Sequence, residues 1–445
     1  MLQGPIAVKL FWFALPIIIS GFLQQLLNAA DIAVVGRFAD SNAMAAVGAN
    51  TFVINLMLNL FVGLSVGANV VIARYIGAGE TEKVKKAVHT SLLIAVLCGF
   101  FLIVAGWLVS RPMLTLLGTP PEILDNAVLY FRIYFMGMPF TLVMNFAIAI
   151  LRSKGDTKRP LFILTYSGLM NVLLNLFFVT QCNMTVEGVA YATLISNGLS
   201  ACILLHLLRK ERSEIRFRFR HLHIDKEELI QIARIGIPAG IQGVIFNISN
   251  VLIQSGVNSL GTAAVAANTA SLNYDYFCFF IGNAFGQAAT SFMGQNLGAL
   301  KIDRCKKIIR DCMILGPSIT FFVSMFLVFY AKPLSELYTT DPEVVTLAVQ
   351  RIGVVLTFYG IHSFNEILSG VLRAMGHAVT PAVINVLFIC GIRLFWLFFV
   401  FPTNPTFSFL MWCYPLSWIV NITVLMGVFF WIVTRAFRAY RLQQA

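Results

Sequence analysis

The chain has 445 residues, of which 58% are hydrophobic and only 12% are charged. Because soluble domains carry about a quarter charged residues, this composition excludes a soluble globular protein. The net charge of +12 would suit a nucleic-acid-binding protein, but the basic residues are distributed as in a membrane protein instead.

Twelve apolar spans, each long enough to cross a bilayer core as a helix, follow one another between polar breaks. In the first half they are 10–35, 43–72, 88–109, 128–151, 160–180 and 188–208. In the second half they are 229–258, 263–293, 308–330, 344–372, 381–401 and 408–434. The first is too long for the apolar core of a signal peptide, so we expect it to be retained. The sequence therefore predicts an all-α integral membrane protein with a lobe at 1–208, a cytoplasmic linker at 209–228 and a second lobe at 229–445.

Basic residues gather on one side of this topology. Of the 32 Lys and Arg residues, 26 fall on the side that holds both termini and three on the opposite side. Such a bias places the termini in the cytoplasm of a multi-pass protein of the cell membrane. The excess charge then predicts contact with anionic lipid headgroups and no contact with nucleic acid.

The linker 209–228 is the one long basic stretch, and it contains Arg216-Phe217-Arg218-Phe219-Arg220. It has two interpretations. One is an interfacial connector between the two halves, and the other is a regulatory lipid-binding segment.

The two halves repeat each other. Four groups of residues in the first half recur in the second, displaced by 218 to 222 positions. They are Pro16, Gly21 and Asn28 with Pro238, Gly243 and Asn250; Ala46-Val47-x-Ala49-Asn50-Thr51 with Ala264-Val265-x-Ala267-Asn268-Thr269; Gly77-Ala78 and Lys85-Lys86 with Gly298-Ala299 and Lys306-Lys307; and Leu151-Arg152, Gly155 and Pro160 with Leu372-Arg373, Gly376 and Pro381. Each half has an even number of spans, so the repeats are parallel. Two bundles related in this way suit alternating access, which indicates a secondary transporter.

These motifs resemble the multidrug and toxic compound extrusion (MATE) family along nearly the whole chain. The matching residues are Gly4-Pro5-Ile6, Leu15-Pro16-Ile17, Gln24, Asn28, Asp31, Val35-Gly36-Arg37, Arg74-x-x-Gly77-Ala78-Gly79, the two Leu-Arg-x-x-Gly motifs and Gly294-Gln295-Asn296-Leu297-Gly298-Ala299. The resemblance implies two six-helix lobes in a V shape. It also implies an antiporter that exports organic, often cationic, compounds in exchange for protons or sodium ions.

Three acids fall well inside predicted spans, where a charge costs at least about 2.5–3.5 kcal/mol on insertion scales. They are Asp31, Asp275 and Glu366. Gln24, Asn28 and Asp31 share one face of the first helix, and Pro16 is expected to kink that helix. We interpret Asp31 as a proton switch, and the resemblance also assigns the coupling ion to an acid at this place. The alternative is that Asp31 only accepts hydrogen bonds near the outer membrane face.

The resemblance adds Asn171, Asn175 and Thr193 to the ion-coupling site of the first lobe. Many family members carry Asp where this chain has Asn175. A neutral amide weakens a sodium site, which favours proton coupling through Asp31. Asn residues between membrane helices are also ordinary interhelical contacts.

Polar stripes in the second half supply further candidates for substrate binding, together with Gln24 and Asn28. They are Asn250, Gln254, Asp275, His362, Asn365 and Glu366. Phe246 and His362 stand where some family members have a pair of acids, so a sodium site is not expected there. A lone His is more often structural, and His362 has that interpretation too.

Four alternatives remain beside a proton-coupled exporter of small organic cations. One is a non-transporting receptor or scaffold, which would leave the cost of the three buried acids unexplained. Another is an exporter of the same cations in which sodium, and not the proton, is the coupling ion. A flippase for lipid-linked precursors should need several intramembrane Arg residues to bind pyrophosphate; only Arg393 lies clearly within a span, with Arg132 and Arg351 near span ends. A membrane enzyme is disfavoured because no catalytic motif is found. We expect no metal site and no cofactor beyond the coupling ion, and a monomer.

Overall fold

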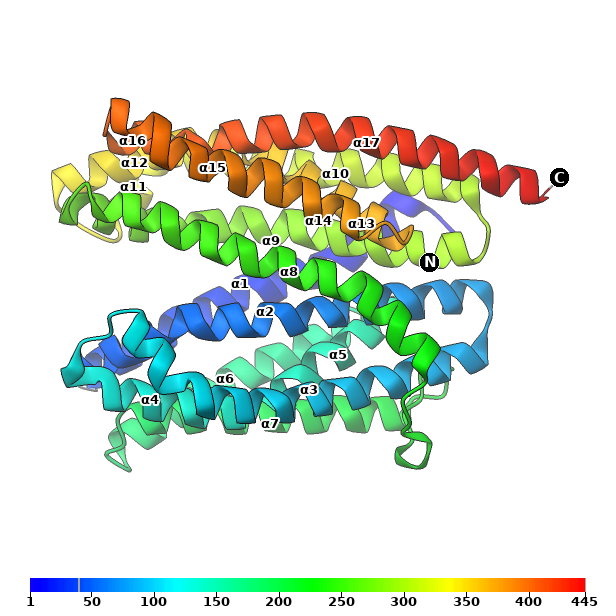
Figure 1. The fold of residues 1–445 in the computed structure, drawn as a ribbon, viewed down its shortest axis with the longest axis horizontal. Coiled ribbons are helices and arrows are strands. Elements are labelled where there is room, and N and C mark those ends of the chain that lie inside the picture. The colour runs from blue at the N-terminus through cyan, green and yellow to red at the C-terminus, as the bar shows by residue number, and fades with distance from the viewer. Residues whose placement is uncertain (39–40, 445) are drawn as a thin grey trace. The chain divides into compact units, whose positions relative to one another are not determined.

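The computed structural model describes the backbone of residues 1–38 and 41–444 and the side chains of residues 1–29 and 45–438. Within these ranges the chain is helical and contains no strand. Figure 1 shows that the long helices within each part of the chain run alongside one another.

The first half contains seven helices for its six predicted spans. They are α1 (Ile6–Phe38), α2 (Ser41–Ala78), α3 (Thr81–Leu116), α4 (Pro121–Met136), α5 (Met138–Lys154), α6 (Lys158–Thr180) and α7 (Val186–Lys210). The fourth span, predicted as one helix, is bent by 47° between α4 and α5. Pro139, in the first turn of α5, has no backbone N–H to continue the hydrogen bonding of α4.

The second half follows the same order with more breaks. Its helices are α8 (Lys226–Asn258), α9 (Thr262–Gly298), α10 (Ile302–Phe329), α11 (Ala331–Glu336), α12 (Pro342–Thr357), α13 (Tyr359–Ala374), α14 (Val379–Asn385), α15 (Gly391–Phe395), α16 (Phe407–Met411) and α17 (Cys413–Gln444). Short helical segments η1 (Phe219–His221), η2 (Val386–Cys390), η3 (Trp396–Val400) and η4 (Phe401–Thr403) lie between them. The tenth span is also bent, by 43° between α12 and α13. The repeat therefore extends to a break that the sequence analysis did not predict.

Nine helices among the described residues are long and apolar enough to cross a membrane, and the two bent pairs raise the number to eleven. The remaining predicted span is α9, which is 37 residues long. This helix packs against α10, α12 and α13. Because protein rather than lipid surrounds much of it, α9 can carry more polar residues than the other spans.

The chain divides into two compact units. The N unit comprises residues 19–240, and the C unit comprises residues 1–18 and 241–445. Helices α1 and α8 each contribute to both units. The division of the sequence into 1–208, 209–228 and 229–445 stays a prediction about the lobes.

Within the N unit, glycines bring α2 and the first half of α8 into backbone contact. A Cβ atom at Gly63 would overlap the backbone of Gly240, and one at Gly67 would overlap the carbonyl of Ile232. Gly236 likewise lies against the backbone of Leu64. Small residues four apart on both helices are the usual means of such close approach in membranes.

The linker packs onto the N unit instead of extending from it. Ile215 and Phe217 are buried, and the Phe217 N–H donates to the Leu208 carbonyl at 3.0 Å. The Arg218 N–H donates to Nε2 of His89 at 3.0 Å. The connection between α7 and α8 is therefore an ordered part of this unit.

Glu211 ties the start of the linker to two basic residues. Its carboxylate accepts from Lys154 Nζ and from Arg159 Nη2, each at 2.9 Å. Burial alone would raise the pKa of Glu211, but the hydrogen bonds and charges of Lys154 and Arg159 lower that pKa to about 2. Glu211 is therefore ionised at neutral pH and holds the linker against α5 and α6.

Candidate functional site

Helices α6 and α7 bring the three predicted amide and hydroxyl residues of the first half together. Asn171 donates from Nδ2 to Thr193 Oγ1 at 3.1 Å and to Ser196 Oγ at 3.4 Å. Asn175 donates to Oδ1 of Asn171 at 3.2 Å. The cluster formed by these four side chains, here called the α6–α7 cluster, contains only neutral groups. Asn171 and Asn175 are both buried.

Helix α1 carries Pro16, Gln24, Asn28 and Asp31. It runs through Pro16 as a single helix, although the proline gives no N–H to the carbonyl of residue 12. Gln24 and Asn28 are exposed on the part of α1 that belongs to the N unit. The side chain of Asp31 lies outside the described residues, so its role stays a prediction.

In the C unit, Asp275 of α9 forms an ion pair with Arg351 of α12. The Arg351 guanidinium donates a hydrogen bond from Nη1 to Asp275 Oδ1 at 3.1 Å and another from Nη2 to Asp275 Oδ2 at 2.6 Å. The Arg351 side chain is 0% exposed and that of Asp275 12% exposed. The sequence analysis placed Arg351 near a span end, and the structure places it in α12, the first of the two helices that make up the bent tenth span. The charge of Asp275 is thus compensated inside the protein.

Asn250 of α8 contacts a second buried arginine. Arg393 of α15 donates Nη1 to Asn250 Oδ1 at 3.2 Å and Nε to Ser417 Oγ at 3.3 Å. Its guanidinium carbon lies 4.3 Å from the centre of the Tyr414 ring, an arrangement that stabilises a cation. No carboxylate pairs with Arg393 among the described side chains. Arg393 stands between the π-helical segments η2 and η3, and such segments are frequent at functional sites.

Gln254 of α8 joins its helix to α9. Its amide nitrogen donates to Asn258 at 2.9 Å, and its amide oxygen accepts from Asn268 at 2.8 Å. Both polar ends of this predicted substrate-binding side chain are engaged within the C unit.

The three polar residues predicted on α13, His362, Asn365 and Glu366, have different surroundings. His362 is surrounded by the rings of Phe279, Tyr359 and Trp418, with centroids 5.3 to 6.2 Å away. Its Nδ1 has no hydrogen-bond partner among the described residues. Glu366 is half-buried and accepts a hydrogen bond from Asn283 of α9.

Asn365 belongs to a buried amide network of the C unit. Asn421 of α17 donates to Asn365 Oδ1 and to Asn385 Oδ1, each at 3.0 Å. Asn385 of α14 donates to Ser369 Oγ at 3.3 Å. This network joins three spans, so His362, Asn365 and Glu366 do not form a single site.

Several residues that complete these clusters were missed by the sequence analysis. They are Ser196, Asn283, Asn385, Ser417 and Asn421, and Arg351 was noted without its partner. Each is a polar residue inside a predicted span, and this alone would have marked it. Among the described residues, no group of three or more His, Cys, Asp and Glu side chains could hold a metal ion.

Comparisons with known proteins agree with this architecture. The MatE family model matches residues 16–177 and again residues 238–397. The probable multidrug resistance proteins YoeA and YpnP of Bacillus subtilis (strain 168) are similar to the chain. YoeA is 28% identical over 390 residues, 86% of this chain and 84% of that protein. YpnP is 25% identical over 386 residues, 86% of each protein.

A solved outward-facing multidrug resistance MATE family transporter of the MOP superfamily has the same fold. The TM-score is 0.90 at 20% identity, over 99% of this chain and 98% of that chain. This likeness confirms the predicted all-α fold with twelve transmembrane helices. Two matches to one family model, displaced by about the interval of the internal repeat, cover most of the sequence. The chain therefore belongs to the multidrug and toxic compound extrusion family of multi-pass membrane transporters and is not an enzyme.

Proposed function

We propose that the chain is a secondary active antiporter that exports cationic or amphipathic organic compounds in exchange for protons, which enter through Asp31. The family and the multidrug resistance proteins among its relatives support the export of such compounds. The observation that carries the coupling assignment is the α6–α7 cluster, whose groups are all neutral. A cluster of amides and hydroxyls cannot release or take up a proton near neutral pH.

The chemistry of this cluster favours protons over sodium ions. Hard cations such as sodium prefer anionic oxygen ligands, and the four described side chains of the α6–α7 cluster contribute amide and hydroxyl oxygens. Asp31 is the only acid that the sequence places well inside a span of the first half. A proton on Asp31 removes a charge within the bilayer and allows the helix to repack about Pro16. A proton and a substrate cation competing for one carboxylate are exchanged for each other as the two lobes alternate access.

The distribution of basic residues supports insertion in the cell membrane with both termini in the cytoplasm. A flippase for lipid-linked precursors has less support. Of the two Arg residues of the C unit weighed for this role, Arg351 is neutralised by Asp275, and Arg393 has no carboxylate partner among the described side chains. One guanidinium makes a weak pyrophosphate site.

Transport into membrane vesicles with imposed gradients tests the proposal. A fluorescent organic cation should move in response to a proton gradient and not to a sodium gradient. Asp31→Asn should abolish this movement while the protein remains folded. Asp125→Asn serves as the control, since Asp125 is exposed and Arg111 is its ion-pair partner among the described side chains. Movement driven by sodium alone, or full activity of Asp31→Asn, would contradict the proposed coupling.

A further inference from the structure

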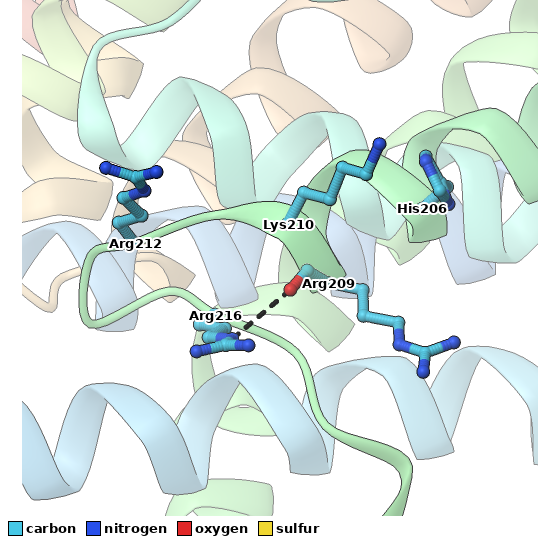
Figure 2. Close-up of a pocket in the computed structure, with 5 residues that line it drawn as sticks. All are labelled: His206, Arg209, Lys210, Arg212 and Arg216. Atoms are coloured by element: carbon cyan, nitrogen blue, oxygen red, sulfur yellow. Dashed lines mark hydrogen bonds between the residues drawn. The ribbon is translucent and has the colours of Figure 1, made fainter.

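A cavity at the end of α7 is lined by basic side chains. It has a volume of about 420 Å³ and is bounded by His206, Arg209, Lys210, Arg212 and Arg216. Figure 2 shows that the end of the helix supplies the first three residues and the loop that folds back supplies Arg212 and Arg216. This volume is within the range of ligand sites in proteins, roughly 300–1,000 Å³.

Glu211 lies among these basic residues in the sequence but does not neutralise them. Glu211, between Lys210 and Arg212, directs its carboxylate to Lys154 and Arg159. Among the described side chains, no carboxylate forms an ion pair with any of the four Arg and Lys residues that line the cavity. The cavity thus has four positive charges without an internal counterion.

The loop holds one of these charges, that of Arg216, against the end of α7. Arg216 donates from Nε to the Arg209 carbonyl at 3.2 Å, the dashed line in Figure 2. The buried side chains of Ile215 and Phe217 fix the adjacent backbone. Like charges held close together repel one another, and a bound anion would relieve that repulsion.

The position of the cavity indicates the source of the anion. Helix α7 is a membrane span, and its last residue is Lys210, so the cavity lies where the span ends. The basic distribution assigns this end to the cytoplasmic side, where anionic lipid headgroups attract Lys and Arg. We propose that this cavity is a specific binding site for a phosphate-bearing anion, held by Arg212 and Arg216 together with Arg209 and Lys210. The position favours the headgroup of an anionic phospholipid, and a free phosphate compound has the same chemistry. This site is independent of the transported substrate and of the coupling ion.

Direct binding to the full-length protein in neutral detergent tests the site. The probes are radiolabelled short-chain phosphatidylglycerol, short-chain phosphatidylcholine and inorganic phosphate, compared at equal ionic strength. The variant Arg212→Gln/Arg216→Gln removes two charges from the cavity. Arg218→Gln/Arg220→Gln removes the same charge from the same linker, at exposed residues that do not line the cavity. Arg212→Gln alone guards against misfolding of the loop, because the Arg212 side chain is exposed and only its backbone N–H, which the substitution keeps, donates to Glu211 Oε1 at 3.3 Å among the described residues.

We expect phosphatidylglycerol to bind at least tenfold more weakly to the cavity double variant and less than twofold more weakly to the linker control. Arg212→Gln alone should weaken binding by an intermediate factor. Binding of inorganic phosphate as tight as that of the lipid, with the same dependence on the variants, would support the site and assign it to a free phosphate compound. Equal weakening in the cavity and control variants, or equal binding of phosphatidylcholine and phosphatidylglycerol, would overturn the proposal.

Discussion

Asp275 and Arg351 provide the sharpest test of the energetics of the C unit. Asp275→Asn leaves the Arg351 guanidinium, which is 0% exposed, without its carboxylate. Removing one partner of a buried ion pair costs about 3–5 kcal/mol, because the other charge stays buried and uncompensated. In domains of roughly 200 residues, a loss of 1 kcal/mol in unfolding free energy lowers the unfolding midpoint by about 2–4 °C. The loss of the ion pair should therefore lower the midpoint by at least about 6 °C.

Thermal unfolding of the purified protein in detergent measures this change. Arg351→Met should also destabilise the protein, but less, since the Asp275 side chain that is left without a partner is 12% exposed, whereas that of Arg351 is 0% exposed. The double variant Asp275→Asn/Arg351→Met carries neither charge and should recover most of the lost stability. Asp125→Asn is the matched control. Asp125 pairs with Arg111 at 3.0 Å, but the two side chains are 81% and 59% exposed, so its midpoint should stay close to that of the parent.

The double variant also tests the predicted substrate role of Asp275. If it unfolds like the parent and still transports, Asp275 serves the structure alone. If it is stable but transports nothing, Asp275 contributes to substrate binding as the sequence analysis predicts. Single variants that unfold within about 2 °C of the parent would refute the buried-pair reasoning itself.

Three further predictions concern the N unit and a control glycine. Asn171→Ala removes the hydrogen bond to Thr193 and should cost about 0.5–2 kcal/mol, seen as a lower unfolding midpoint; an unchanged midpoint would contradict the bond. Gly240→Leu should lower the folded yield because its side chain would overlap the backbone of α2, whereas Gly353→Ala, with open space around it, should not. Glu211→Gln should lower the midpoint at neutral pH. Because the folded-state pKa of Glu211 is depressed to about 2, the difference in midpoint between the parent and this variant should be complete above about pH 5 and vanish as the pH falls toward 2. A difference that stays constant with pH would exclude the ion pair as its cause.

The sequence by itself determined the number of spans, their order and the repeat. These features are local, because the bilayer thickness requires a certain length of apolar residues in each segment. The span predicted at 263–293 corresponds to α9, a helix of 37 residues whose hydropathy is lower than that of the other spans. The bends at α4–α5 and α12–α13 were missed, since a break within a continuously apolar segment leaves the hydropathy pattern unchanged.

Only the tertiary structure decided which polar side chains meet. Asp275 and Arg351 are 76 residues apart in the sequence, and their pairing depends on how α9 and α12 are rotated and packed. His362 and Asn365 share one face of α13, yet one lies among aromatic rings and the other in an amide network, because different helices cover each turn. The linker is rich in basic residues in the sequence, but folding directs Glu211 toward Lys154 and Arg159 and forms an open cavity lined by Arg212 and Arg216. Helical periodicity assigns a residue to a face, whereas the contacts of that face are set by distant segments.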